Sequence, residues 1–439
     1  MILKALSLLA LTAPVCALEP SNSNALGSNA HSNGGDLLAI RVGRAETISH
    51  GTLHHAVILV EGGKIVTIGE DLPIDRGIPI LDRPDWVAMP GLVSAHTRIG
   101  LARSSSRGFD PVGMPAREIY PRQEIWQDLL ELGVTTLGIV PEGNSGVPGQ
   151  AIAIRPRGET VEEMIVEKGV YLKVNMSSSA SAKKIIRDAF EKVDKHKEKV
   201  EKEREKWEKA NSKKKKKKSR SKKDDDKDKE DEKEDRTKSK KEESKEFVPP
   251  APAPAVQTFM DLREGSLNAV ISIRKAGDYL HLLDLMKDEE SVPYFLRVPL
   301  RTDIDLFEVA EKLGEKETLL ILNSQITLQA HSRRERNIPA ELVRAGASIA
   351  LTPERDFFRS YEEWMNDVGF LVSRGLDRDK ALAAITLEGA RALGLDERLG
   401  SLDVDKDANI IFWDGDPLEP ASTIEAVMLE GDFVAGEVD

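Results

Sequence analysis

The chain has few of the residues that build thiol sites and aromatic binding surfaces. Its 439 residues include one cysteine, eight histidines and 5% aromatic residues. The cysteine, Cys16, follows Lys4 and an apolar run from Ala5 to Val15. This pattern is typical of a secretory signal peptide that covers residues 1–17. Cleavage after Ala17 would leave a chain without cysteine, which excludes a disulfide, a thiol nucleophile and a thiolate metal site.

Long apolar segments are also missing. The run in the signal peptide is well short of the roughly 20 residues that a helix needs to span a bilayer. No other segment is long and apolar enough for a transmembrane helix. Because of the signal peptide, we expect an exported protein, periplasmic or secreted. Residues 18–36 are rich in Gly, Ser and Asn, and we expect them to form a flexible lead-in.

Charge is distributed unevenly along the chain. Residues 183–246 contain 28 basic and 20 acidic side chains, so the stretch carries +8 and the rest of the chain −20. An acidic body repels phosphate backbones, and we expect no nucleic-acid partner. The stretch has helical Glu and Lys spacing up to about Ala210, then blocks of like charge, then a Pro and Ala spacer. We therefore expect residues 183–256 to form a charged, largely disordered insertion. It would be either a tether to an anionic surface or a solvated loop.

Strand patterns at both ends enclose a repeating pattern in the middle. Residues 37–85 and 398–439 alternate apolar residues with Gly turns, which predicts a small β-sandwich domain built from both termini. Residues 86–397 alternate strands with helices, one of them near residues 122–133. The expected strands are VAMPGLVSAH, VTTLGIV, VYLKVNM, LNAVISI, PYFLRVP, TLLILNS and ASIAL. This many strand–helix units predict an α/β fold with a closed (β/α)8 barrel of the TIM type.

Several segments, in the right order, resemble a known family. The amidohydrolase superfamily, in its imidazolonepropionase-like branch, has an opening segment similar to EGGKIVTIGEDLP and a first barrel strand similar to WVAMPGLVSAHTRIGL. Its closing segment is similar to ALAAITLEGARALGLDERLGSLDVDKDANIIFWDGDPLEP. LGVTTLGIVPEGNSGVPGQAIAI and ETVEEMIVEKGVYLKV are also similar to it. The resemblance covers most of the mature chain outside the insertion. It implies a hydrolase that acts on C–N bonds other than peptide bonds in a small-molecule substrate.

The resemblance also implies a divalent metal, such as zinc, at the C-terminal mouth of the barrel. The family's first ligand pair is His-x-His, and this chain has His96 and then Arg98, whose guanidinium has no lone pair for a metal. Lys173 aligns with a strand lysine that some members carbamylate. Glu354 is the carboxylate nearest to the position of the family's catalytic aspartate. We expect His96 to be a residual ligand position in a degenerate metal site, with Glu354 and Lys173 as the candidate catalytic residues.

Other patterns for catalysis are weak. Of the eight histidines, His96, His281 and His331 fall in the barrel, with His281 expected on a partly buried helix face and His331 in a surface loop. The Gly-rich loop at residues 141–150 lacks the Lys and Ser or Thr of a phosphate-binding loop. No G-x-S-x-G motif marks a serine nucleophile.

Arginines stand at several positions where the family places metal ligands. Arg98, Arg274 and Arg297 would lie near the barrel mouth, where they could bind an anion such as a carboxylate or phosphate. Alternatively, they form ordinary ion pairs with Glu354, Asp356 and Asp278. Two functions therefore stay open, a metal-dependent hydrolase and a non-catalytic binding or scaffolding barrel that takes an anionic ligand. The oligomeric state is not set by these patterns.

Overall fold

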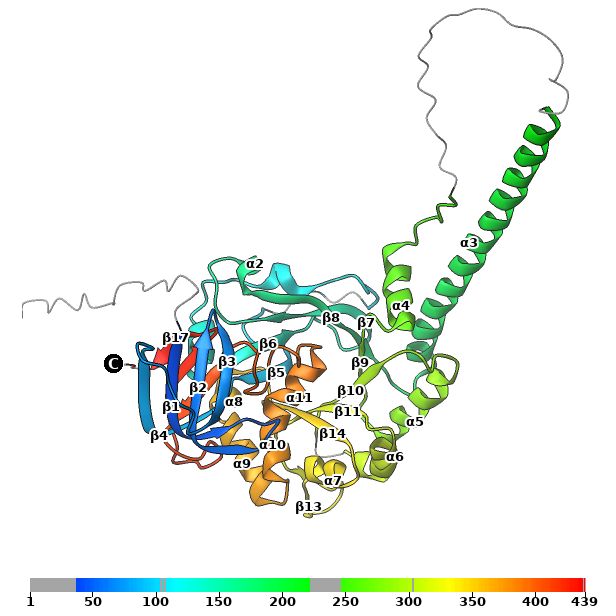
Figure 1. The fold of residues 1–439 in the computed structure, drawn as a ribbon. Helices are drawn as coiled ribbons and strands as arrows, with labels where there is room; N and C mark the ends of the chain where they lie inside the picture. The colour runs from blue at the N-terminus through cyan, green and yellow to red at the C-terminus, as the bar shows by residue number, and fades with distance from the viewer. Residues whose placement is uncertain are drawn as a thin grey trace, which may run out of the picture.

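The computed structural model describes residues 37–102, 105, 108–221, 246–301, 304–436 and 438. It contains a sheet built from both ends of the chain and a second sheet surrounded by helices (Figure 1). The expected signal peptide at 1–17 and the lead-in at 18–36 lie outside the described residues, as do residues 222–245 of the charged insertion.

The first sheet has seven strands in the order β17-β16-β15-β4-β1-β2-β3. Its strands are β1 (Leu38–Glu46), β2 (Thr52–Glu61), β3 (Lys64–Glu70), β4 (Ile80–Pro90), β15 (Ile410–Trp413), β16 (Ile424–Leu429) and β17 (Asp432–Gly436). Strands β1 and β4 pair in parallel, and the other pairs are antiparallel. Because β4 pairs with β15, the N-terminal and C-terminal segments share one ladder and one apolar core, which includes Ile40 and Phe412.

The second sheet forms a nearly closed barrel of eight strands. They are β5 (Leu92–Thr97), β6 (Val134–Ile139), β7 (Gly146–Ile154), β8 (Ile165–Asn175), β9 (Ala269–Ser272), β10 (Tyr294–Val298), β11 (Leu319–Asn323) and β14 (Ser348–Thr352). The two edge strands, β5 and β14, contact each other. All seven barrel strands expected from the sequence are present. A TIM-type barrel places the C-terminal ends of its parallel strands at one mouth, which is where a site would lie.

Strand β7 departs from the expected alternation of strands and helices. It is antiparallel to both β6 and β8 and arises from the segment interpreted above as a Gly-rich loop. Only six residues separate β6 from β7, too few for a helix and its turns. Gly146 has a φ of 63°, and a Cβ there would lie 2.0 Å from the Gly108 carbonyl oxygen. The glycines that indicated a loop instead allow the chain to reverse and pack as a strand.

Helices cover the outer face of the barrel. They are α1 (Ile125–Glu131), α2 (Val161–Met164), α5 (Ala276–Leu285), α6 (Ala310–Glu315), α7 (Ile338–Arg344), α8 (Phe358–Glu362), α9 (Trp364–Ser373), α10 (Arg378–Ile385) and α11 (Leu387–Ala392). Short 3₁₀ turns occur at Pro115–Glu118, Met286–Asp288 and Leu306–Val309, and β12 (Thr327–Leu328) pairs with β13 (Glu335–Arg336). Helix α1 confirms the helix expected near residues 122–133. Among the described helices, none combines the length and apolar content needed to cross a bilayer.

The charged insertion begins with a helix that belongs to the barrel. Helix α3 (Ala180–Ser221) follows β8, and α4 (Pro254–Glu264) precedes β9 and packs against α3. The first turns of this charged stretch pack against the body of the protein. Helix α3 buries Ile186, Ala189, Phe190 and Val193. The spacing of apolar residues at the start of α3 predicts that this face is buried. The high charge of the remaining turns makes the apolar pattern hard to recognise in the sequence. The C-terminal part of α3 extends away from the body (Figure 1).

Candidate functional site

A cavity of about 430 Å³ lies at the mouth of the barrel. Residues at or just beyond the C-terminal ends of β5, β6, β8, β9, β10 and β14 line it, together with the first residues of α3. All six site residues expected from the sequence line this one cavity. They are His96, Arg98, Lys173, Arg274, Arg297 and Glu354. The parallel strands bring these side chains together because their C-terminal ends meet at the same mouth.

His96, near the end of β5, is held by Tyr171 on β8. The His96 Nδ1 and Tyr171 hydroxyl lie 3.0 Å apart, and the same hydroxyl donates to the Ala95 carbonyl oxygen at 3.0 Å. A hydroxyl has one proton, so both bonds form only if His96 donates from Nδ1–H. Nε2 then keeps its lone pair, with no partner among the described residues. Burial, followed by the charges of Arg297 and Lys173, lowers the pKa of His96 well below its ordinary value, so the ring is neutral.

Lys173 enters the cavity from β8. Its side chain is buried, with the residue 6% exposed, and Nζ donates to the Pro141 carbonyl oxygen at 2.9 Å. No salt bridge to Lys173 exists within the described chain. Burial, followed by the nearby Arg98, lowers the pKa of Lys173 to about 8. The amine therefore exchanges a proton close to physiological pH.

Arg297, on β10, is half-buried, and three of the five N–H donors of its guanidinium are unused within the described chain. Nη1 donates to the carbonyl oxygens of Val298 and Ile321 at 3.1 Å and to Asn323 Oδ1 at 3.2 Å. Nε and Nη2 have no partner among the described residues and no salt bridge reaches the group. Burial lowers the pKa of Arg297 to about 10, opposed by the charge of Asp356, so the guanidinium remains charged at neutral pH.

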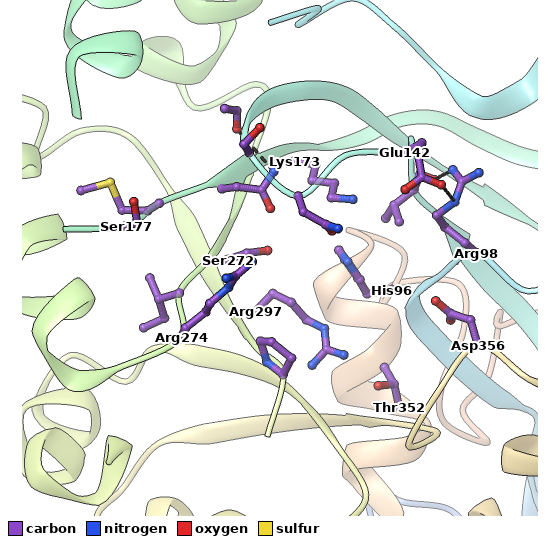
Figure 2. Close-up of a pocket in the computed structure, with 18 of the residues that line it drawn as sticks. His96, Arg98, Glu142, Lys173, Ser177, Ser272, Arg274, Arg297, Thr352 and Asp356 are labelled. Carbon is purple, nitrogen blue, oxygen red and sulfur yellow. Dashed lines mark hydrogen bonds and ion pairs between the residues drawn. The ribbon is translucent and has the colours of Figure 1, made fainter. Parts of the chain in front are cut away.

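The other two predicted arginines have different roles. Arg98 Nη2 lies 2.8 Å from Glu118 Oε2 and Nε lies 3.1 Å from Glu142 Oε2, while Nη1 donates to the Val140 carbonyl at 2.8 Å. Its charge is therefore compensated. Arg274 is exposed, and its guanidinium has no partner in the part of the chain that is described. Figure 2 shows Arg98 beside Glu142 on one side of the opening, Arg274 on the opposite side, and Arg297 and His96 between them.

The alternative expectation was that the three arginines pair with Glu354, Asp356 and Asp278, but the structure gives these residues other partners. Arg98 pairs with Glu118 and Glu142 rather than with the acidic residues near β14. The Glu354 carboxylate lies 3.2 Å from Arg355 Nε. Asp278 accepts from two backbone N–H groups, those of Ser178 and Arg274. These partners lie in segments between the barrel strands. The pattern of the strands does not predict how such segments approach a strand end.

Two further residues complete the site, Asp356, which was expected only as an ion-pair partner of the arginines, and Tyr171. Asp356 Oδ1 accepts from Thr97 Oγ1 at 2.6 Å, which ties the segment after β14 to the end of β5. Tyr171 positions His96 as described above. Period-two alternation along β8 places Tyr171 on the same face as Lys173, and this signal could have found it. The other barrel histidines do not reach the cavity. His331 lies in an exposed turn as expected, while His281 on α5 is exposed rather than partly buried.

Comparison with known proteins identifies the fold. Residues 333–438 match the model of the amidohydrolase family. The structure of an amidohydrolase from Thermotoga maritima MSB8 is similar over 91% of this chain and 100% of its own, with a TM-score of 0.70 and 22% identity. Residues 333–438 are thus similar to the amidohydrolase family, and the likeness of the structures shows the fold. A prolidase solved with N-methylphosphonate-L-proline is similar in fold over the same 91%, with a TM-score of 0.53 and 12% identity.

A curated relative matches over a shorter region. The imidazolonepropionase of Syntrophobacter fumaroxidans (strain DSM 10017 / MPOB) is 38% identical over 89 residues, which are 20% of this chain. The match spans 21% of the relative, about a fifth of its length. This chain therefore shares a short segment with that enzyme.

Amidohydrolases commonly use divalent metals such as zinc, but the residues at this mouth do not suit one. Within the described chain, no three His, Cys, Asp or Glu side chains gather in a geometry that could hold a metal ion. His96 Nε2 has a lone pair that could bind a metal, and the charged groups that lower the pKa of His96 are Arg297 and Lys173. Two cations beside one imidazole repel a divalent cation and attract an anion.

Proposed function

We propose that the barrel mouth of this protein binds a small organic anion, a carboxylate in the first place, without a divalent metal. The observation that carries the proposal is the half-buried guanidinium of Arg297 in the cavity, whose Nε and Nη2 have no partner among the described residues. A planar guanidinium edge fits a carboxylate through two parallel hydrogen bonds. Lys173 adds a second positive group in the same cavity. An anion would therefore relieve a charge imbalance that the protein itself leaves.

The charges lining the cavity support this assignment. Five cationic side chains and three carboxylates line it. Two of the cations, Arg98 and Arg355, are already paired with carboxylates. The remaining cations are Lys173, Arg274 and Arg297, with Asp356 as the remaining carboxylate. Lys173 is buried without a carboxylate partner in the described chain, and an unpaired buried charge is costly, so a bound anion stabilises this arrangement.

Thermal unfolding of the full-length protein with a panel of small carboxylates and inorganic phosphate tests the proposal. A ligand at 100 times its Kd stabilises the folded state by about 2.7 kcal/mol, which is several degrees in Tm for a domain of moderate size. The expected result is stabilisation by at least one carboxylate in the panel. If no carboxylate or phosphate raises the Tm at millimolar concentration, the proposal is wrong.

A metal-dependent hydrolase of non-peptide C–N bonds is the second candidate. It is favoured by the family match over residues 333–438 and by the segment shared with an imidazolonepropionase. Elemental analysis of protein incubated with zinc or manganese distinguishes the candidates, together with assays on lactams and hydantoins. Stoichiometric metal with turnover would replace the anion-binding proposal.

Anion binding is expected to weaken as the pH rises through about 8. The pKa of Lys173 is lowered to about 8, so the amine is largely cationic below this pH and neutral above it. The groups whose charges act on Lys173 are Arg98 and Arg297, which lower its pKa, and Glu142 and Asp356, which raise it. A bound carboxylate favours the ammonium, so the protein should take up protons on binding near pH 8.

Calorimetric titration with the active carboxylate in two buffers of different ionisation enthalpy measures this uptake. Lys173→Met should abolish the proton uptake, whereas Lys168→Met should leave it unchanged, because Lys168 is exposed on the same strand and does not line the cavity. A binding enthalpy that is the same in both buffers would contradict the role of Lys173 in anion binding.

We also propose that the protein acts outside the cytoplasm, after cleavage following Ala17. The proposal rests on the sequence of residues 1–17. N-terminal sequencing of the protein purified from its native cells should begin at Leu18, and thiol titration of the denatured protein should find no cysteine. An intact N-terminus carrying Cys16 would contradict export through this signal.

A further inference from the structure

Lys173 has the surroundings of a nucleophilic amine. Its side chain is buried, yet it lines the cavity, and its one hydrogen bond goes to a neutral carbonyl oxygen. Structural buried lysines are usually paired with a carboxylate, because an unpaired ammonium is costly away from water. Lys173 has no such partner within the described residues. The neutral amine therefore fits this position well, with a lone pair that can attack a ligand.

His96 and Arg297 supply the other two groups that an amine reaction needs. Figure 2 shows Lys173, His96 and Arg297 around the same space. The Tyr171 hydroxyl fixes His96 with its proton on Nδ1, which leaves Nε2 able to accept a proton in the cavity. The free edge of Arg297 can hold a carboxylate. The three side chains come from β5, β8 and β10 and meet because these strands end at one mouth.

We propose that Lys173 forms an imine with the carbonyl carbon of a small 2-oxo carboxylate, whose carboxylate group is bound by Arg297. The inference rests on the proposed function and names the ligand class for the same site. A small ligand with a carbonyl group next to its carboxylate fits within a cavity of about 430 Å³ that both Lys173 and Arg297 line. Covalent capture by a lysine amine is an established way to activate a carbonyl compound.

The atoms balance without an oxidant or reductant. Nζ attacks the carbonyl carbon, the C–N bond forms, and the carbonyl π electrons move to the oxygen. His96 Nε2 takes one proton from the nitrogen of this adduct and passes it to the oxygen, which becomes a hydroxyl. The hydroxyl then leaves as the nitrogen lone pair closes the C=N bond, and His96 passes it the remaining nitrogen proton, so that it leaves as water. The products are one imine and one water molecule.

Trapping with sodium borohydride tests the imine, with pyruvate as the probe and full-length protein. Borohydride reduces an imine to a stable secondary amine, so intact mass spectrometry should find one reduced pyruvate per chain and peptide mapping should place it on Lys173. Lys173→Arg retains the positive charge and should remove the label. Arg297→Gln should reduce labelling at low pyruvate concentration by at least tenfold, whereas Arg333→Gln, exposed and outside the cavity, should not.

The controls separate this inference from the proposed function. Acetate has the carboxylate but no carbonyl, and acetaldehyde has the carbonyl but no carboxylate, so both should label far less than pyruvate. Stabilisation by carboxylates with Lys173 unmodified after borohydride overturns the imine and leaves anion binding intact. Label spread over surface lysines, with none enriched on Lys173, also overturns it. If carboxylates neither stabilise the protein nor support trapping, the proposed function and the imine are both wrong.

Discussion

Replacing Arg297 with glutamine is expected to weaken carboxylate binding by about 10- to 100-fold. Hydrogen bonds to charged groups contribute about 1.5–3 kcal/mol, and a tenfold change in affinity corresponds to about 1.4 kcal/mol. Glutamine still carries an amide N–H₂ to donate to the Ile321 carbonyl or Asn323 but loses the charge and the free guanidinium edge. Isothermal titration with the carboxylate that stabilises the protein measures the change.

Two further variants show whether the loss belongs to the cavity. Arg333→Gln removes an exposed arginine outside the cavity and should leave the affinity unchanged. Arg274→Gln removes the exposed arginine at the rim and should cost less than the Arg297 variant, because water screens its charge. Circular dichroism confirms folding in each case. An Arg297→Gln protein that is folded and binds the carboxylate as tightly as the wild type would contradict the central role of this guanidinium.

Replacing Phe190 with alanine is expected to destabilise the protein by about 3–5 kcal/mol, the range for removing a buried aromatic side chain. Phe190 is 6% exposed, packs edge-on against Phe259 of α4 at a centroid distance of 5.1 Å, and lies 5.0 Å below the Arg263 guanidinium. Arg263 also bridges Asp194 of α3 and Glu289. The cavity left by alanine would therefore loosen the contact that attaches the charged helix to the barrel.

Urea unfolding followed by far-ultraviolet circular dichroism measures the change in the free energy of unfolding. Phe357→Ala is the matched control, because Phe357 is 65% exposed and its loss should stay within about 0.5 kcal/mol. A cost below about 1 kcal/mol for Phe190→Ala would mean that the first turns of α3 are not part of the folded body. A second transition at low urea would show that the α3–α4 pair unfolds separately from the barrel.

The candidate site could be predicted in part. Strand ends are local features, and the residues placed there by alignment, among them His96, Lys173 and Arg297, all line one cavity. Their partners could not be predicted in the same way. Glu118 reaches Arg98 from a 3₁₀ turn and Glu142 from the loop after β6, and the chain gives no local signal for how such a segment approaches a strand end. The three arginines therefore differ in role although their residue type is the same, since carboxylates compensate the charge of Arg98 but not that of Arg297.

The sequence by itself determined the order of strands and helices, because apolar periodicity and turn residues act over a few positions. It also determined which residue types lie at the barrel mouth, including the arginine two residues after His96. The tertiary structure decided that β7 runs as an antiparallel strand and that the first turns of α3 are buried, since both depend on which surfaces meet. It also decided which charges are compensated. Compensation depends on distances between segments far apart in the chain, and those distances exist only once the barrel has closed.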